Sequence, residues 1–190
     1  MSRLGVLAAL LALAGPLAVS AATFELSERQ VQEAIGVGER STTQDSVGTE
    51  WRVRHGGAGP VVTVMTPFHR LALAARHAAF RNEPLTPRDR SRLLKEQQDR
   101  LVFWVELKGP REDFARYFTP RLMVGERQID PSFTQNERTA VRADDGAYLA
   151  RCVYGFPTKL VDGEGKVVLL VRDGDGRDVA SIRIDLSTMR

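Results

Sequence analysis

The stretch from Thr66 to Arg81 gathers the side chains of this chain that are best suited to bind an anion. It contains two of the three histidines and three arginines. At about 100° per residue, a helix would place Arg70, His77 and Arg81 within about 40° of one another. Arginine grips a carboxylate or phosphate through two parallel hydrogen bonds, and a protonated histidine adds positive charge beside it. The sequence thus offers this stripe as a candidate site for a carboxylate, a phosphate or a sugar acid, against the alternative of a solvated helix surface.

The other two histidines, His69 and His55, carry weaker patterns. His69 precedes His77 by eight residues, so on a helix they stand about 12 Å apart along the axis and point in different directions. No HExxH motif or comparable ligand spacing occurs, and we expect no metal site. We expect His69 to share a solvated side of the helix with Arg76. His55 lies in the turn "RHGGAGP", either on the rim of a binding site or as a plain turn residue.

Cys152 is the only cysteine, so the chain can form no internal disulfide. It belongs to an alternating series that we expect on one face of a strand: Tyr148, Ala150, Cys152, Tyr154 and Phe156. The pattern predicts a packed thiol, with an intermolecular disulfide or a nucleophile as the alternatives.

"RDGDGRD" predicts a hairpin turn rather than a calcium loop, because it lacks the bidentate glutamate of an EF-hand. We find no catalytic motif and no cofactor-binding motif.

Three helices are predicted to position these side chains. The first begins at Ser27, which can cap it, and ends at Gly36 and Gly38. Two more, over about 67–82 and 87–99, each open with Thr-Pro, which is a cap followed by proline at the first helical position. The buried face of the second helix is expected to be Leu71, Ala74, Ala75 and Ala78. Leu73 and Phe80 are expected to pack against Leu93 and Leu94 of the third helix.

Seven strands are predicted from alternating or β-branched runs bounded by turns. They cover 51–54, 61–66, 101–109, 120–124, 147–156, 166–173 and 179–186. The stretch 125–143 is polar and aperiodic, and we interpret it as mainly loop. The helical hairpin would then be an insertion, at about 67–99, between the second and third strands.

The residues Asp144-x-Gly146-x-Tyr148 resemble the corner that precedes the second-to-last strand of immunoglobulin domains. The resemblance covers five residues and implies an Ig-like β-sandwich. Taken with the periodicity, it predicts a mainly β (α+β) protein: a sandwich of about seven strands with an inserted helical hairpin and a short N-terminal helix.

The first 22 residues predict a signal peptide. Arg3 is followed by the apolar run "LGVLAALLALAG", a Gly-Pro break and the small residues "VSAA". We expect cleavage after Ala22, with cleavage after Ala21 as the alternative and a retained membrane anchor as the rival interpretation. A lipid anchor on a processed cysteine is excluded because the only cysteine is Cys152. No later segment is apolar enough to span a membrane, so no transmembrane segment is expected after cleavage.

Residues 23–190 fit one exported domain, with β-rich parts at 51–66 and 101–190. Without Arg3 its charged residues number 26 basic and 24 acidic, a net charge of +2. So small an excess of mixed charges argues against a nucleic-acid partner. The sequence favours a periplasmic or secreted, non-catalytic binding module that recognises a small anionic ligand or an envelope protein. A periplasmic or secreted hydrolase-like enzyme with scattered residues and a structural envelope assembly protein are the alternatives.

Overall fold

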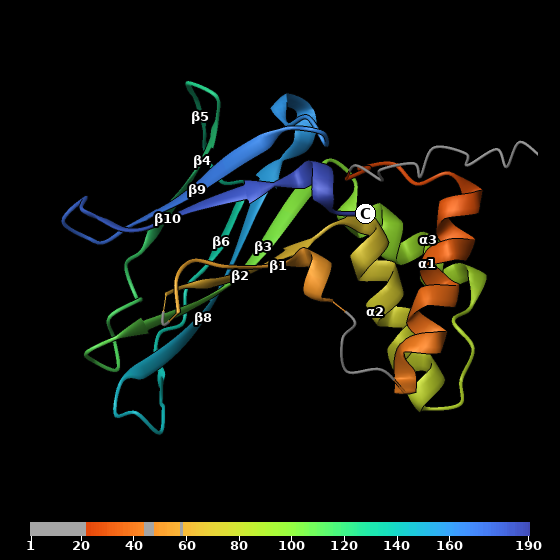
Figure 1. Ribbon diagram of the computed structural model, residues 1–190, viewed down its shortest axis with the longest axis horizontal. Coiled ribbons are helices and arrows are strands. Elements are labelled where there is room, and N and C mark those ends of the chain that lie inside the picture. The colour runs from red at the N-terminus through yellow and green to blue at the C-terminus, as the bar shows by residue number, and fades with distance from the viewer. Residues whose placement is uncertain (1–21, 44–47, 58) are drawn as a thin grey trace, which may run out of the picture.

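The computed structural model describes residues 22–43, 48–57 and 59–190. Over these residues the chain forms three α-helices and two open antiparallel sheets, one of six strands and one of four. The helices gather on one side of the molecule and the sheets extend away from them (Figure 1). The α+β class expected from the sequence is therefore confirmed. Apart from Ala22, the expected signal peptide lies outside the described residues.

Sheet A contains six strands. Its order is β1 (Arg52–Arg54), β2 (Val61–Met65), β3 (Arg100–Gly109), β8 (Tyr148–Pro157) and β6 (Phe133–Gln135), and β7 (Val141–Arg142) also pairs with β8. The two long strands β3 and β8 pair from Arg100 opposite Pro157 to Gly109 opposite Tyr148. Along β3 the odd-numbered residues from Leu101 to Leu107 are buried, while the even-numbered ones face outward. Sheet A thus has one core face and one outer face.

Sheet B has the order β10 (Asp178–Asp185), β9 (Lys166–Arg172), β4 (Thr119–Val124) and β5 (Arg127–Ile129). Its buried residues and those of sheet A belong to one hydrophobic cluster, which includes Phe103 and Phe156 from sheet A and Leu122, Leu169 and Ile182 from sheet B. The rings of Phe103 and Phe156 meet edge to face at 5.8 Å. The two sheets therefore share a core.

The three helices are α1 (Glu28–Arg40), α2 (Pro67–Phe80) and α3 (Pro87–Gln97). Short 3₁₀ turns are η1 (Ser41–Thr43), η2 (Thr49–Trp51), η3 (Thr158–Leu160) and η4 (Leu186–Thr188). The caps expected from the sequence are present: the side chains of Ser27, Thr66 and Thr86 each accept a hydrogen bond from a main-chain N–H three residues later. The helical hairpin does lie between the second and third strands, as predicted.

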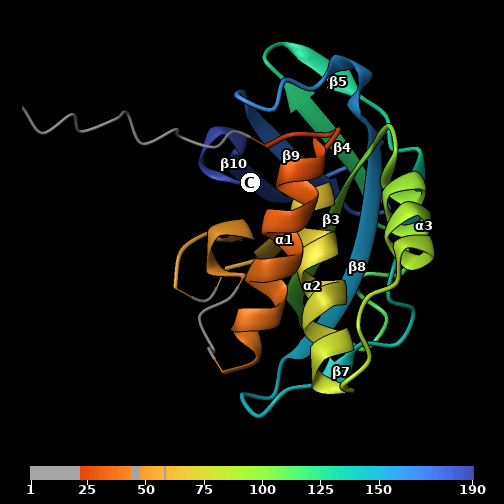
Figure 2. The same ribbon diagram turned by 90° about the vertical axis from the view of Figure 1, so that its right-hand side faces the viewer.

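Helix α1 does not end at its glycines, which corrects the sequence prediction. It continues through both to Arg40, and it lies against α2 (Figure 2). A Cβ atom at Gly38 would be 2.2 Å from the Ala72 carbonyl oxygen and 2.8 Å from the Ala75 Cβ. Gly38 therefore allows the two backbones to approach, because any side chain there would collide with α2.

The expected seam between the second and third helices is also wrong in part. Leu93 and Leu94 pack partly against the core, but Phe80 is 58% exposed and its ring lies 5.5 Å from the Arg76 guanidinium carbon. His69, expected in water, is 2% exposed. Of the buried face predicted for α2, Leu71, Ala75 and Ala78 are buried but Ala74 is only partly so, whereas Phe68, His69 and Ala72 are also buried. A helical wheel gives the angle of a residue but not which other elements lie beside it.

The stretch 125–143 contains β5, β6 and β7, which the polar composition concealed. The residues that suggested an immunoglobulin corner form the tight turn between β7 and β8. Gly146 there has φ 83°, and the Ala143 N–H donates to the Ala147 oxygen at 2.8 Å. The Ig-like sandwich is not confirmed.

Candidate functional site

The outer face of sheet A carries an apolar floor built by strand register. Trp104 of β3 lies opposite Thr63 of β2 and Val153 of β8. One row further on, Val102 lies opposite Gly155, and Phe133 of β6 pairs with the same glycine. Trp104 is 44% exposed and Phe133 is 42% exposed. Exposed apolar side chains that form a contiguous patch, unlike single ones, often mark an interaction site.

Two cavities meet on this floor, and we call them together the sheet-A hollow. One has a volume of about 490 Å³ and is lined by Arg70, Glu96, Gln97, Arg100, Val102, Trp104, Phe133 and Val153. The other, of about 330 Å³, is lined by Thr63, Trp104, Val105, Glu106, Gln135, Glu137, Arg151, Cys152 and Val153. Both include Trp104 and Val153, so they form one surface. Helices α2 and α3 contribute its wall and the sheet contributes its floor.

The absence of a side chain at Gly155 leaves room for the Arg100 side chain on this face of the sheet. A Cβ atom there would lie 3.0 Å from the Arg100 Cδ and 3.3 Å from the Phe133 Cβ. The Arg100 side chain therefore leans along the strands toward the row of Trp104, over a position that has no side chain of its own. The apolar stem of arginine suits this position because its charged end stays in water.

The linings of the two cavities hold three arginines and three glutamates, and not all of these side chains are paired. Arg70 contacts Glu96 at 3.8 Å, and Glu106 contacts Arg52 at 3.4 Å. Arg100 and Arg151 form no ion pair within 4.0 Å in the part of the chain that the structure describes, and neither does Glu137. Two arginines and one glutamate are thus left without an ion pair, although Arg151 lies directly opposite Glu106 in the sheet. Each of the two arginines has hydrogen-bond donors free for an acidic ligand.

Gln97 adds an unsatisfied polar group. It is the last residue of α3 and is only 6% exposed, and its Oε1 atom has no hydrogen-bond partner among the described residues. Buried polar atoms normally have a partner, since leaving one unpaired costs about 1–3 kcal/mol.

The predicted anion stripe is only partly associated with this site. Arg70 lines the hollow, half-buried beside Glu96. His77 is exposed on α2, and Arg81 follows the end of that helix, where its Nε lies 3.2 Å from Glu83. His55 is exposed in the turn before β2 and does not line the hollow.

The sequence itself contains a signal for the hollow. In "LVFWVELKG" the odd-numbered residues form the core face, which places Trp104 on the opposite face beside Val102. Two apolar residues on a presumed solvent face were the sign of a contact surface. Arg151, Phe133 and Gln97 could not have been added, because only the strand pairing and the end of α3 bring them there.

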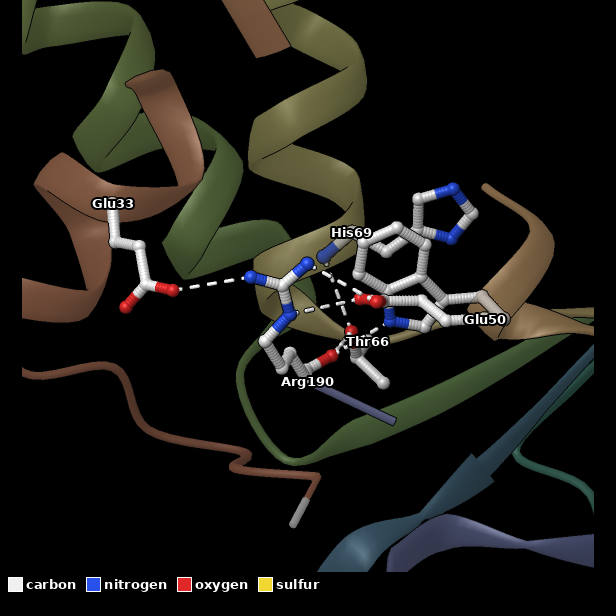
Figure 3. A network of polar contacts seen from close by, with 6 residues as sticks. Glu33, Glu50, Thr66, His69 and Arg190 are labelled. Atoms are coloured by element: carbon white, nitrogen blue, oxygen red, sulfur yellow. Dashed lines mark hydrogen bonds and ion pairs between the residues drawn. The ribbon is translucent and has the colours of Figure 1, made fainter. Parts of the chain in front are cut away.

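A second polar cluster lies at the base of α2 (Figure 3). The guanidinium of Arg190 binds both carboxylate oxygens of Glu50, at 3.0 and 3.1 Å, and one oxygen of Glu33 at 3.1 Å. The main-chain oxygen of Arg190 accepts hydrogen bonds from the Thr66 hydroxyl and from the Trp51 indole N–H. The groups of this cluster are paired with one another, so we interpret it as a structural tie.

His69 belongs to this cluster and not to a solvated stripe. Its Nδ1 lies 2.9 Å from the Val64 carbonyl oxygen, and its ring stacks on Trp51. Burial lowers the pKa of His69, although the Val64 carbonyl and the charge of Glu50 oppose that shift. The neutral ring therefore donates its Nδ1–H to Val64.

Cys152 is 1% exposed, which confirms the prediction of a packed thiol. Burial raises the pKa of its thiol, so the group stays protonated and is a poor nucleophile. Burial also raises the pKa of Tyr154, whose hydroxyl donates to Asn136 at 3.1 Å.

Among the described residues no cluster of three His, Cys, Asp or Glu side chains is arranged to hold a metal ion. None of the described helices has the length and apolar character needed to cross a membrane.

Comparison with known proteins gives little further information. No family model matches the chain, and no curated protein matches it. Among solved structures, one similar chain is a protein of unknown function from Burkholderia pseudomallei K96243. The two share 9% sequence identity with a TM-score of 0.42, over 86% of this chain and 91% of the other.

Proposed function

We propose that this protein is an exported, non-catalytic binding module, and that it binds a small acidic ligand with an aromatic or apolar part in the sheet-A hollow. One observation carries the proposal: the exposed ring of Trp104 lies between two arginines, Arg100 and Arg151, that form no ion pair within 4.0 Å among the described residues. The ring offers a stacking surface and each guanidinium offers a bidentate grip. As part of the same proposal we keep a kinship with Ig-like sandwiches, which the two antiparallel sheets around a shared core support.

Strand geometry supports a ligand that reaches from the ring to a guanidinium. Arg151 belongs to the row next to Trp104, about 7 Å along the strands, and Arg100 starts two rows away on the other side but leans back over Gly155. Either cation can therefore reach an acidic group attached to a ring that stacks on the indole.

Trp104 also provides the measurement. The chain has two tryptophans, and Trp51 is 1% exposed, so a small quencher or ligand changes mainly the fluorescence of Trp104. We expect phenylacetate to change this fluorescence in a saturable way. Phenylacetamide, its neutral equivalent, should bind about fivefold to tenfold more weakly. Added salt should weaken phenylacetate binding, because the contributing charges are near the surface. The variant Trp104→Phe should lose the signal.

Two double variants separate this site from the stripe predicted on α2. Arg100→Gln with Arg151→Gln should abolish the preference for phenylacetate, whereas His77→Gln with Arg81→Gln should leave it unchanged. The reverse result would support the stripe. Equal binding of acid and amide to the unmodified protein, or no binding of either at millimolar concentration, would overturn the proposed function.

A further inference from the structure

The main-chain nitrogen of Ala22 lies within hydrogen-bond distance of two carbonyl oxygens. It is 3.2 Å from the oxygen of Gly163, in the turn before β9, and 3.2 Å from the oxygen of Leu186, at the start of η4. Ala22 is 5% exposed and belongs to the hydrophobic cluster. A peptide nitrogen has one hydrogen, which the two carbonyls would have to share. A primary ammonium has three, and it could donate one to each carbonyl and keep one for water.

The sequence leaves two positions open for removal of the signal peptide, after Ala22 and after Ala21. Cleavage after Ala22 would remove the residue that fills this position and leave both carbonyls without their donor. We propose that a signal peptidase hydrolyses the bond between Ala21 and Ala22, and that the two carbonyls then hold the new α-ammonium group of Ala22. In that step the hydroxyl of water goes to the Ala21 carbonyl carbon, and the released nitrogen takes up protons to become an ammonium.

The two carbonyls belong to segments that are fixed to each other. The Leu186 N–H donates to the Gly165 oxygen at 3.0 Å, which ties η4 to the turn that contains Gly163. A Cβ atom at Gly163 would lie only 1.7 Å from the Ala22 carbonyl oxygen. Residue 163 must therefore lack a side chain for the main chain of Ala22 to occupy this position.

The charges on these two segments suit a cation. The turn carries two exposed carboxylates, Asp162 and Glu164, and Asp162 accepts a hydrogen bond from the Glu164 N–H at 3.0 Å. Lys166 follows the turn and Asp185 precedes η4, and these two side chains form an ion pair at 3.4 Å. On its own segment Ala22 is followed by the exposed Glu25. The surroundings thus carry a net negative charge.

The burial of Ala22 implies that cleavage precedes folding. Because Ala22 is covered in the folded protein, a peptidase can reach the bond before it only while the chain is unfolded. Folding would then close the core over a new N-terminus. This inference depends on the export part of the proposed function and is independent of the ligand.

Mass spectrometry of the exported protein gives the first test. We expect an N-terminus at Ala22. An N-terminus at Thr23, or a chain that retains the leader, would overturn the proposal whatever the hollow binds.

A comparison of purified chains gives the second test and needs no export. The chain that begins at Ala22 should unfold a few degrees higher than one that begins at Thr23. Gly163→Ala should lower the midpoint of the first chain and leave that of the second unchanged, because only the first contains the oxygen that the new Cβ would strike. An equal effect in both chains would mean that Gly163 is needed for contacts other than the one with Ala22, and it would refute the proposed binding of Ala22 at this position.

Acetylation of the Ala22 amine distinguishes an ammonium from an amide. The free amine should give the higher midpoint at pH 6.5, where an α-amino group with a pKa near 8 is charged, and this advantage should shrink by pH 9.5. An advantage that does not depend on pH, or no advantage, would contradict a role for the charge.

Discussion

The indole ring of Trp51 lies flat on the imidazole of His69, with ring centroids 4.2 Å apart and an angle of 5° between the planes. Both residues are buried, at 1% and 2% exposed. The stack joins the end of η2 to the first turn of α2. It also removes His69 from water, so the folded protein favours the neutral ring.

The first prediction is that stability falls on mild acidification because of His69. Its pKa is lowered in the folded state, so below about pH 6.5 the unfolded chain binds more protons than the folded one. The stabilisation is therefore complete above that pH and is lost as pH falls below it. Denaturant unfolding between pH 7.5 and 5.5 should show this slope, before the carboxylates titrate.

The variant His69→Gln should flatten the slope, even if it lowers stability at every pH. His77→Gln, at an exposed position of the same helix, should keep it. A slope that survives the first substitution would assign the titration to another group.

The second prediction concerns the contact between α1 and α2. Gly38→Ala should destabilise the protein by about 1–3 kcal/mol, because the new methyl group would strike the Ala72 carbonyl and the Ala75 side chain. Gly36→Ala is the matched control in the same helix. A Cβ there meets only the flexible end of Arg40, so the gain in helix propensity should stabilise by up to about 1 kcal/mol. Urea unfolding of the two variants would measure this difference in sign.

The third prediction ranks the two threonine caps. Thr66→Ala should cost about 2 kcal/mol, because its hydroxyl both accepts from the His69 N–H and donates to the part-buried Arg190 oxygen. Thr86→Ala should cost about 1 kcal/mol or less, since Thr86 caps an exposed helix start. Equal losses in chemical denaturation would show that the bond to Arg190 contributes nothing.

The fourth prediction separates two phenylalanines of α2. Phe68 is 2% exposed and its substitution by alanine should cost about 3–5 kcal/mol. Phe80 is 58% exposed, so Phe80→Ala should change the free energy of unfolding by less than about 1 kcal/mol. A large loss at Phe80 would mean that the ring is covered in solution, for example by a second molecule.

The elements that could be predicted are those with a strong period or a local cap. The alternation of β3 and β8 and the Thr-Pro starts of α2 and α3 depend on residues close in sequence, and these elements are found where expected. The short strands β5 to β7 carry mostly exposed polar residues, so no apolar period identifies them. They exist because β4 and β8 offer them hydrogen bonds.

The candidate site was less accessible to prediction, because its residues meet through long-range pairing. Arg70 was identified from its type and its helix position, but its partner Glu96 lies on α3. The burial of His69 required Trp51, which no helical wheel of α2 includes. The sequence showed which side chains have suitable chemistry, and the strand register decided which of them share a surface.

The tie at Arg190 has a consequence for the order of folding. Its hydrogen bonds to Thr66, Trp51 and Glu33 join residues that are 124, 139 and 157 positions apart. Closing such long loops costs entropy before any contact repays it, whereas the neighbouring strands β9 and β10 need only a short turn. We therefore expect the tie to form after the transition state, with φ-values near zero. Substituting Arg190 removes the guanidinium bonds to Glu33 and Glu50 but keeps the main-chain oxygen. Such variants should unfold faster and refold at a nearly unchanged rate, so this tie would govern how long the folded protein survives rather than how fast it is made.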